Sequence, residues 1–252
     1  MEAAFFDLDK TVISKSSSLA LTGPMYRAGL VSRSALLKGA YAQMVYLLLG
    51  ADEKKMDRVK EAMLALTRGW DRDQVEQIIR DAMSDLDPYI YLEALDLMEL
   101  HRALRRRIYI VSSSAEEVVR PMAERLGDVS VLATRAKVDE GGRYTGELEF
   151  YCYGENKAVA MKEVAEREGI DLSGSYAYSD SATDLPMLEA VGHPVAVNPD
   201  AELAEIAKRE GWDVLSFEKL GGRLRMAAAV AIAAAVGGSG SWLAARRRSR
   251  GA

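Results

Sequence analysis

Short apolar runs that end abruptly in polar clusters constrain the fold of this chain more than any other feature. Four such runs predict strands, at residues 3–6, 108–111, 176–178 and 195–197. A polar cluster follows each run, and a helical pattern comes next. Strands that alternate with helices favour a parallel sheet with helices on both faces. We therefore predict an α/β protein whose polar clusters meet beyond the carboxyl ends of its strands.

The stretch between the first two predicted strands carries a helical pattern. Apolar side chains recur there at spacings of one, three and four, and the broadest apolar face lies at residues 36–48. We predict that residues 15–87 form an all-helical cap over the polar crevice, and that Pro88 opens another helix, which runs to about Arg106. Periodicity alone fits equally well an ordinary helical subdomain that has no role at the crevice.

A change of period marks the segment between Thr134 and Phe150. Apolar and polar residues alternate there, and Glu140-Gly141-Gly142 interrupts the alternation, which predicts a small β-hairpin. Helices are predicted to begin near Ala115, to include residues 185–188, and to cover residues 155–167 and about 201–209.

Charge is divided unevenly along the chain. Residues 1–222 hold 27 basic and 38 acidic side chains, a net charge of −11, whereas residues 223–252 hold six arginines and no acid, a net charge of +6. An acidic surface repels phosphate backbones, so we expect no nucleic-acid partner. One cysteine and two histidines exclude disulfide scaffolds and zinc fingers. The first residues lack the basic region and the long apolar run of a signal peptide, so we expect a cytoplasmic protein.

The last thirty residues differ from the rest in composition. Residues 226–245 are uncharged and mostly alanine and glycine, and arginines follow them. Their length would span a membrane, but alanine and glycine contribute little to insertion. We expect residues 223–252 to form a flexible or partly helical tail. Peripheral contact of its arginines with anionic lipid, and hence membrane association, is the alternative.

Four aspartates follow two of the predicted strands. Asp7 and Asp9 are separated by one residue, so an extended backbone places both carboxylates on the same side. Turns also use aspartate for local hydrogen bonds, so this pair alone is weak evidence of a site. Asp180 and Asp184 follow another predicted strand. Together the four carboxylates would repel one another without a cation, and they supply the hard oxygen ligands that Mg²⁺ prefers. We predict one divalent cation between them.

The other two strand ends supply groups that would bind a phosphate. Ser112 offers a hydroxyl, and the backbone N–H groups of Ser113, Ser114 and Ala115 begin a helix whose N-terminus favours anions. Lys157, near the start of the helix after the hairpin, could bring a positive charge to the same anion. Serine-rich segments also cap helices, and most lysines are solvated surface charges, so neither feature alone defines a phosphate site.

Taken in order, these motifs resemble those of the haloacid-dehalogenase superfamily of phosphohydrolases, subfamily IB, and most closely the branch that includes phosphoserine phosphatase. The first signature of that family is an apolar strand followed by D-x-D-x-T, and the second is a strand that ends in serine or threonine. The third is a lysine, and the fourth is an aspartate pair. The matching segments are residues 5–11, residues 110–112, Lys157 and residues 179–187. The resemblance covers about residues 3–215.

The resemblance implies a fold and a reaction. The fold is a Rossmann-like parallel sheet core at residues 1–14 and 88–222, with residues 15–87 as the helical cap. The reaction is hydrolysis of a small organic phosphate monoester through an aspartyl-phosphate intermediate. The resemblance implies that Asp7 is the nucleophile and that Asp9 is the general acid and base.

The resemblance also implies a ligand set. Ser112 and Lys157 would hold the phosphoryl group, beside the backbone at Ser113. Mg²⁺ would be bound by Asp7, the backbone carbonyl of Asp9 and Asp180, with Asp184 behind them, acting through water. A regulatory or membrane-associated binding protein that keeps this fold with little turnover is the alternative function. No pattern indicates an oligomeric state.

Two positions depart from the family pattern. Phosphoserine phosphatases of this branch carry a glutamate nine residues after the nucleophile, which receives the ammonium of the substrate. Ser16 stands there, which puts an amino-acid phosphate in doubt. Tyr178-Ser179 replaces the glycine that usually precedes the first metal aspartate, although the spacing of the carboxylates is unchanged.

Overall fold

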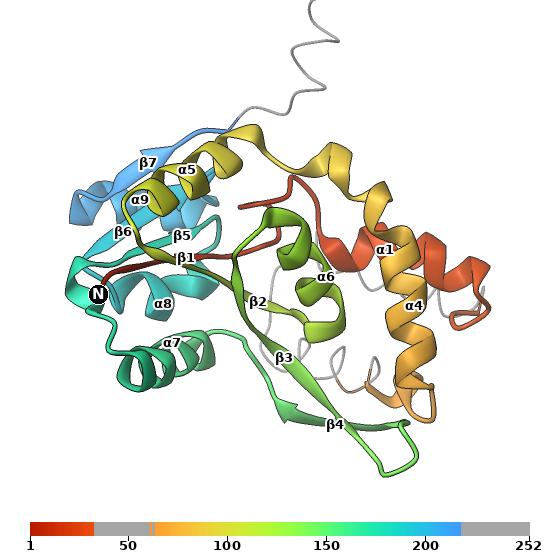
Figure 1. The fold of residues 1–252 in the computed structure, drawn as a ribbon. Helices are drawn as coiled ribbons and strands as arrows, with labels where there is room; N and C mark the ends of the chain where they lie inside the picture. Colours follow the sequence, from red (N-terminus) through yellow and green to blue (C-terminus); the bar gives the residue numbers. More distant parts are fainter. Residues whose placement is uncertain (33–60, 62–63, 218–252) are drawn as a thin grey trace, which may run out of the picture. The chain divides into compact units, whose positions relative to one another are not determined.

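The structure is a computed structural model that describes residues 1–32, 61 and 64–217. A seven-stranded sheet forms the centre of this part of the chain (Figure 1). The strand order is β4-β3-β2-β1-β5-β6-β7. Neighbouring strands are parallel, except that β3 and β4 form an antiparallel hairpin. The predicted α/β fold, with its parallel sheet and hairpin, is confirmed. The strands are β1 (Ala3–Phe6), β2 (Arg107–Ala115), β3 (Ser130–Val138), β4 (Tyr144–Phe150), β5 (Tyr176–Ser179), β6 (His193–Val197) and β7 (Asp213–Leu215).

The central strand β1 determines where the polar clusters meet. All four of its residues are buried, as expected of a strand that is covered on both faces. Phe6 lies beside Ile110 of β2 and Tyr178 of β5. Because neighbouring parallel strands run in the same direction, the residues that follow β1, β2 and β5 leave the sheet at one edge.

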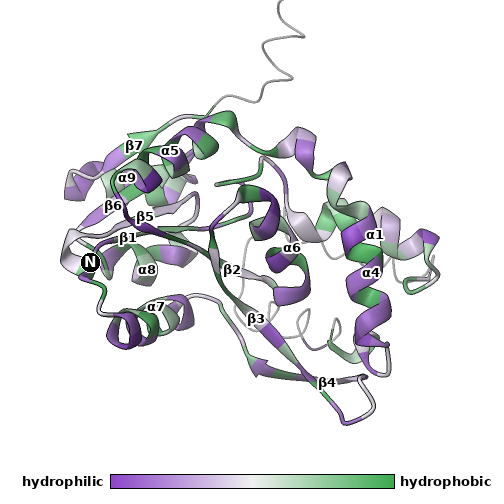
Figure 2. Cartoon of the chain, in the orientation of Figure 1, coloured by the Kyte–Doolittle hydropathy of each residue, from purple (hydrophilic) through white to green (hydrophobic). Residues whose placement is uncertain are grey.

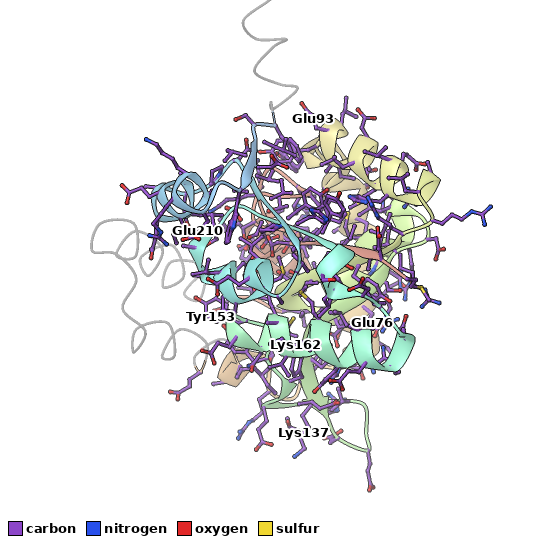
Figure 3. The ribbon with its side chains drawn as sticks, turned by 90° about the vertical axis from the view of Figure 1, so that its left-hand side faces the viewer. Glu76, Glu93, Lys137, Tyr153, Lys162 and Glu210 are labelled. Atoms are coloured by element: carbon purple, nitrogen blue, oxygen red, sulfur yellow. The ribbon has the colours of Figure 1, made fainter. Side chains whose placement is uncertain are left out.

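Helices cover both faces of the sheet. On one face, His101 of α5 (Leu92–Ala103) contacts the ring of Phe6, and α6 (Glu116–Leu126) packs against β2 and β3. On the other face lie α7 (Glu155–Glu168), α8 (Leu185–Glu189) and α9 (Ala201–Glu210), which share a buried core with Phe5. Figure 2 shows hydrophobic and hydrophilic residues alternating along these helices. Charged side chains such as Lys137 and Glu210 lie at the periphery in Figure 3.

The described residues between positions 15 and 87 are helices and turns. They include α1 (Ser17–Arg27), α4 (Arg72–Ala82) and the short 3-10 turns Met83–Asp85 and Asp87–Tyr89. Ahead of α4, the backbone pairs with the hairpin: the Tyr144 N–H donates to the Trp70 carbonyl, and the Gly69 N–H donates to the Tyr144 carbonyl. The apolar face predicted at residues 36–48 lies outside the described residues.

Several predicted element boundaries differ from the structure. Pro88 was predicted to open a helix, but it lies in a 3-10 turn, and α5 begins only at Leu92 and ends at Ala103. The reason is that Ile90 bridges Ile13 and the Tyr91 N–H donates to the Val12 carbonyl, which keeps the chain extended there. The strand β7 and the first residues of β3 were not predicted. The starts of α7 and α9 are at the predicted residues.

The chain divides into two units. Met1–Ser216 forms one compact unit, and a second unit begins at Phe217. The predicted tail, residues 223–252, lies outside the described residues. Among the residues that are described, no helix combines the length and the hydrophobicity needed to cross a bilayer.

Candidate active site

A buried ammonium joins two of the predicted aspartates at the carboxyl edge of the sheet. Lys157 Nζ donates to Asp7 Oδ1 at 2.6 Å and to Asp184 Oδ2 at 2.7 Å. Asp7 directly follows β1, and its N–H donates to the Tyr178 carbonyl, which extends the pairing with β5 by one residue. Gly154, at φ 55°, turns the chain into α7 and thereby brings Lys157 to this edge. The structure thus brings together three predicted site residues.

The single positive charge of Lys157 lies near several carboxylates, those of Asp7, Asp184 and Asp9. Burial raises the pKa of Asp7 to about 8; Lys157 opposes this shift, whereas Asp184 and Asp9 add to it. Burial lowers the pKa of Lys157, but the carboxylates of Asp7 and Asp184 outweigh burial and leave it above its usual range. The ammonium is therefore charged, and full ionisation of Asp7 calls for a second cation.

Asp9 is held by different partners from those of Asp7. The Ser17 N–H, at the start of α1, donates to Asp9 Oδ1 at 2.9 Å, and Ser114 Oγ lies 3.5 Å from Asp9 Oδ2. The hydroxyls of Ser17 and Ser114 are 2.8 Å apart. Burial raises the pKa of Asp9, and hydrogen bonds from Ser17 and Ser16 oppose that shift. Asp9 therefore lies between the end of β2 and the first helix of the predicted cap.

The two predicted phosphate-binding serines lie in the second half of β2 and differ in exposure. Ser112 is buried, and its Oγ accepts the Ser114 N–H at 3.1 Å, so its hydroxyl hydrogen can still be donated. The Ser113 side chain is exposed, and its carbonyl accepts the Thr134 hydroxyl at 2.8 Å. The helix after them begins at Glu116, one residue beyond the predicted start.

Asp180 and Asp184 lie on the loop that follows β5. Asp180 Oδ2 is 3.7 Å from the ammonium of Lys10. Burial raises the pKa of Asp180 to about 6; Lys10 lowers it and Asp184 raises it. Asp184 Oδ2, besides binding Lys157, accepts the Ser179 hydroxyl at 2.7 Å. Asp184 Oδ2 therefore binds both Lys157 and Ser179 of its own loop.

Three serines of this network were not predicted as site residues. Ser17 and Ser114 hold Asp9, and Ser179 holds Asp184. Ser179 stands where the family usually has glycine, and its hydroxyl ties the loop to the Lys157 pair. Serine is common in loops and caps, so the residue type gave no signal that would separate these three from other serines.

The chemistry of the site fits Mg²⁺. Four aspartate carboxylates lie near a single buried ammonium, and burial raises the pKa of Asp7 and of Asp180, so a divalent cation there would favour their charged forms. Within residues 1–32, 61 and 64–217, no three His, Cys, Asp or Glu side chains converge closely enough to hold a metal alone. Mg²⁺ commonly takes one or two carboxylates and completes its octahedron with water and phosphate oxygens. Two carboxylates and a backbone carbonyl satisfy that requirement.

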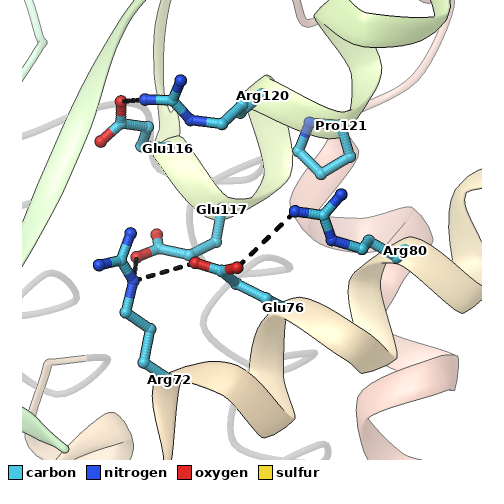
Figure 4. Close-up of a pocket in the computed structure, with 7 residues that line it drawn as sticks. All are labelled: Arg72, Glu76, Arg80, Glu116, Glu117, Arg120 and Pro121. Carbon is cyan, nitrogen blue, oxygen red and sulfur yellow. Dashed lines mark hydrogen bonds and ion pairs between the residues drawn. The ribbon is translucent and has the colours of Figure 1, made fainter. Parts of the chain in front are cut away.

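A small pocket lies elsewhere in the described structure, between α4 and α6 (Figure 4). Its lining is charged, with arginines and glutamates from both helices. None of the predicted site residues lines it. The lining residues are Arg72, Glu76, Arg80, Glu116, Glu117, Arg120 and Pro121.

The chain is similar to several known proteins. The family model of haloacid dehalogenase-like hydrolases matches residues 4–189. A probable phosphatase of Mycobacterium tuberculosis (strain ATCC 25618 / H37Rv) is 49% identical, over 93% of this chain and 84% of its own length. A phosphoserine phosphatase of the same strain is 32% identical, over 98% of this chain and 82% of its own. A crystal structure of a protein of unknown function from Bordetella pertussis Tohama I has a TM-score of 0.75 and 28% identity, and covers 85% of this chain and 97% of its own.

The family match covers the part of the sheet domain that carries the predicted site. The family model begins in β1, just before Asp7, and ends in α8, just after the loop that carries Asp180 and Asp184. All four motifs of the resemblance therefore lie inside the matched segment. The chain belongs to the haloacid dehalogenase-like hydrolase family, in the branch that includes phosphoserine phosphatase, and it is a phosphatase.

Proposed function

We propose that this phosphatase hydrolyses a small organic phosphate monoester by forming an aspartyl-phosphate on Asp7. The observation that carries the proposal is the 2.6 Å contact between Lys157 Nζ and Asp7 Oδ1. It places the positive charge that a phosphoryl group requires beside the carboxylate that would attack it. The second carboxylate, Asp9, is bound by Ser17 and Ser114, and no lysine among the described residues donates a hydrogen bond to it.

The difference between the two environments supports different roles for Asp7 and Asp9. Asp7 would attack phosphorus, and the leaving oxygen would take a proton from Asp9. Asp9 would then remove a proton from the water that cleaves the acyl phosphate. A general acid needs a pKa near the working pH, and burial raises the pKa of Asp9 in that direction. Both roles need separate carboxylates, because one group cannot bind phosphorus and carry the proton.

The remaining site residues would hold the substrate. Ser112 would donate its hydroxyl hydrogen, and the backbone at Ser113 and Lys157 would hold other oxygens of the phosphoryl group. Asp7, Asp180 and the backbone carbonyl of Asp9 would bind Mg²⁺, with Asp184 acting behind them. The cation would neutralise phosphate charge and keep Asp7 ionised.

Substrate choice is proposed from the position of Ser16. Its hydroxyl lies near Asp9 and partly opposes the rise that burial causes in the pKa of that carboxylate. A neutral hydroxyl gives no counter-charge to a substrate ammonium, so we propose that phosphoserine is a poor substrate, although a relative carries the name phosphoserine phosphatase. A screen over sugar phosphates, glycerol phosphate, lysophospholipids, nucleotides and phosphoserine tests this. A strong preference for phosphoserine would contradict the role given to Ser16.

The Asp7→Asn variant tests the mechanism. We expect phosphate release from p-nitrophenyl phosphate to need Mg²⁺ and to fall by about a thousandfold or more in this variant. Mass spectrometry of the acid-quenched wild-type protein should show one added phosphoryl group, which the variant should lack. An exposed aspartate provides the control, and Asp171→Asn should keep activity within about twofold. Full activity in Asp7→Asn would reject the proposal.

A further inference from the structure

A carboxylate outside the predicted site, that of Asp200, connects α9 with the loop that carries Asp180. Asp200 Oδ1 accepts the Leu203 N–H at 2.8 Å and so caps α9. Its Oδ2 accepts the Ala182 N–H at 3.0 Å. Its own N–H donates to the Asp180 carbonyl at 2.8 Å. One residue therefore holds the backbone on both sides of Ser181.

The fold explains how Asp200 reaches this loop. β5 and β6 are parallel neighbours, with Ser179 beside Ala196, so the segments after them start next to each other. Asn198 has φ 44°, in the left-handed region that turns a chain sharply. After this turn, Asp200 lies against the β5 loop before α9 begins at Ala201.

The two ends of the β5 loop are fixed by different groups. The Asp184 end is held by Lys157 and Ser179 through hydrogen bonds of 2.7 Å. The Asp180 side chain has an ion pair with Lys10, whose side chain is 66% exposed, and such a pair contributes little. The Ser181 N–H donates to Ser179 Oγ at 3.3 Å within the loop itself, whereas the bonds from Asp200 tie the Asp180 end of the loop to the start of α9.

We propose that Asp200 is a positioning residue for the cation, acting by fixing the backbone from which the Asp180 carboxylate projects. This inference rests on the proposed magnesium role of Asp180. Residues behind a metal ligand set its orientation, and their loss weakens metal binding. Asp200 touches none of Asp7, Asp9, Ser112 and Lys157 among the contacts found in the described structure, so its loss should weaken Mg²⁺ binding and spare the chemical step.

Two substitutions separate this role from helix capping. In Asp200→Ser the hydroxyl still caps α9 but cannot also reach Ala182. In Asp200→Asn one oxygen still caps α9, and an amide N–H₂ faces the Ala182 N–H in place of an acceptor. Asp71→Ser is the matched control, because Asp71 caps α4 in the same way, accepting the Gln74 N–H at 3.1 Å, and touches no site loop.

The experiment measures Mg²⁺ binding to each full-length chain by isothermal titration calorimetry, and the Mg²⁺ dependence of p-nitrophenyl phosphate hydrolysis. We expect the dissociation constant for Mg²⁺ to rise about tenfold in both Asp200 variants and to stay within about twofold in Asp71→Ser. The kcat at saturating Mg²⁺ should stay within about twofold of wild type. If one Asp200 variant fails to fold by circular dichroism, the other carries the test.

Two failures can be told apart. A wild-type chain that binds Mg²⁺ together with Asp200 variants that bind it equally well would overturn the positioning role alone. A wild-type chain that binds no Mg²⁺ would overturn the proposed role of Asp180 and the inference with it. Asp200 variants that lose kcat at saturating Mg²⁺ but keep the wild-type dissociation constant for Mg²⁺ would also overturn the positioning role.

Discussion

Lys157 is the residue whose charge has the largest local consequence. The residue is 2% exposed, and its ammonium lies between Asp7 and Asp184, which are 150 and 27 positions away in the chain. A buried charge must be paired, so the position of the lysine and that of the two carboxylates depend on one another. The same charge faces the place where a phosphoryl group would sit.

Replacing Lys157 with methionine should remove phosphate binding. We expect Lys157→Met to lower kcat/KM for p-nitrophenyl phosphate by about a hundred- to a thousandfold, the usual effect of losing one donor to a developing anion. The inhibition constant of inorganic phosphate should rise in parallel. Lys162→Met, on the exposed face of the same helix (Figure 3), should leave both within about twofold. An unchanged phosphate inhibition constant would contradict the role of Lys157.

His101 should make stability depend on pH. It is buried on α5, with Nε2 2.8 Å from the Tyr178 hydroxyl, and burial together with Arg106 lowers its pKa to about 4. The unfolded chain takes up this proton near pH 6.5, so the neutral imidazole contributes its full stability above pH 6.5 and loses it as the pH falls towards 4.

The measurement is the melting temperature between pH 7.5 and 4.5. His101→Gln removes this titration, so its melting temperature should fall by several degrees less than that of wild type over that range. His193→Gln, at the exposed start of β6, should behave like wild type. Identical pH profiles for wild type and His101→Gln would show that the histidine does not couple to folding.

At the scale of elements, α4 is joined to α6 by charged side chains and to the hairpin by its backbone. Arg72 Nε lies 3.0 Å from Glu76 and 3.6 Å from Glu117. Dashed lines mark both ion pairs in Figure 4. Glu117 is buried, and burial together with this carboxylate raises the pKa of Tyr144 above its usual range. The predicted cap and the core are thus linked through a buried carboxylate.

Replacing Arg72 should therefore lower the free energy of unfolding more than replacing Arg80, which lies two turns further along α4. We expect Arg72→Met to lower the free energy of unfolding by about 1–3 kcal/mol, because Glu117 remains buried without its cation. Arg80→Met should lower the free energy of unfolding by less than about 1 kcal/mol, because Glu124 is exposed, its other partner Glu76 is only half-buried, and Glu76 keeps its ion pair with Arg72. Urea unfolding measures both, and adding Glu117→Gln should restore part of the loss in Arg72→Met. Equal costs for the two arginines would contradict a buried link.

The elements that could be predicted are those whose signal lies within one segment. The four apolar runs and the alternation around the hairpin fix strands locally, and the polar residues at their ends follow from parallel pairing. β7 has three residues, of which two are exposed, and so gives no apolar run. The start of α5 depends on pairing of Ile90 with Ile13, a contact that periodicity cannot reveal. Ser114 and Ser179 acquire partners only through folding, so their residue type carried no signal.

At the scale of the whole molecule, charge is segregated along the chain. Residues 1–222 carry −11 and residues 223–252 carry +6, all from arginine. Each basic group near an anionic lipid surface contributes about 1 kcal/mol of attraction, which salt screens. A protein whose main unit repels such a surface would bind it only through the arginine-bearing segment.

Truncation separates this attraction from catalysis. A chain that ends at Phe217 keeps the compact unit Met1–Ser216 and every proposed site residue, so we expect its kcat/KM to stay within about twofold of the full chain. In vesicle sedimentation, the full chain should bind vesicles that contain phosphatidylserine at low salt and should release them as salt rises, whereas the truncated chain should not bind. Neutral phosphatidylcholine vesicles are the control, because they offer no charge to the arginines. Equal sedimentation of the two chains would place any lipid contact elsewhere, and lost activity in the shorter chain would show that the C-terminal residues support the site.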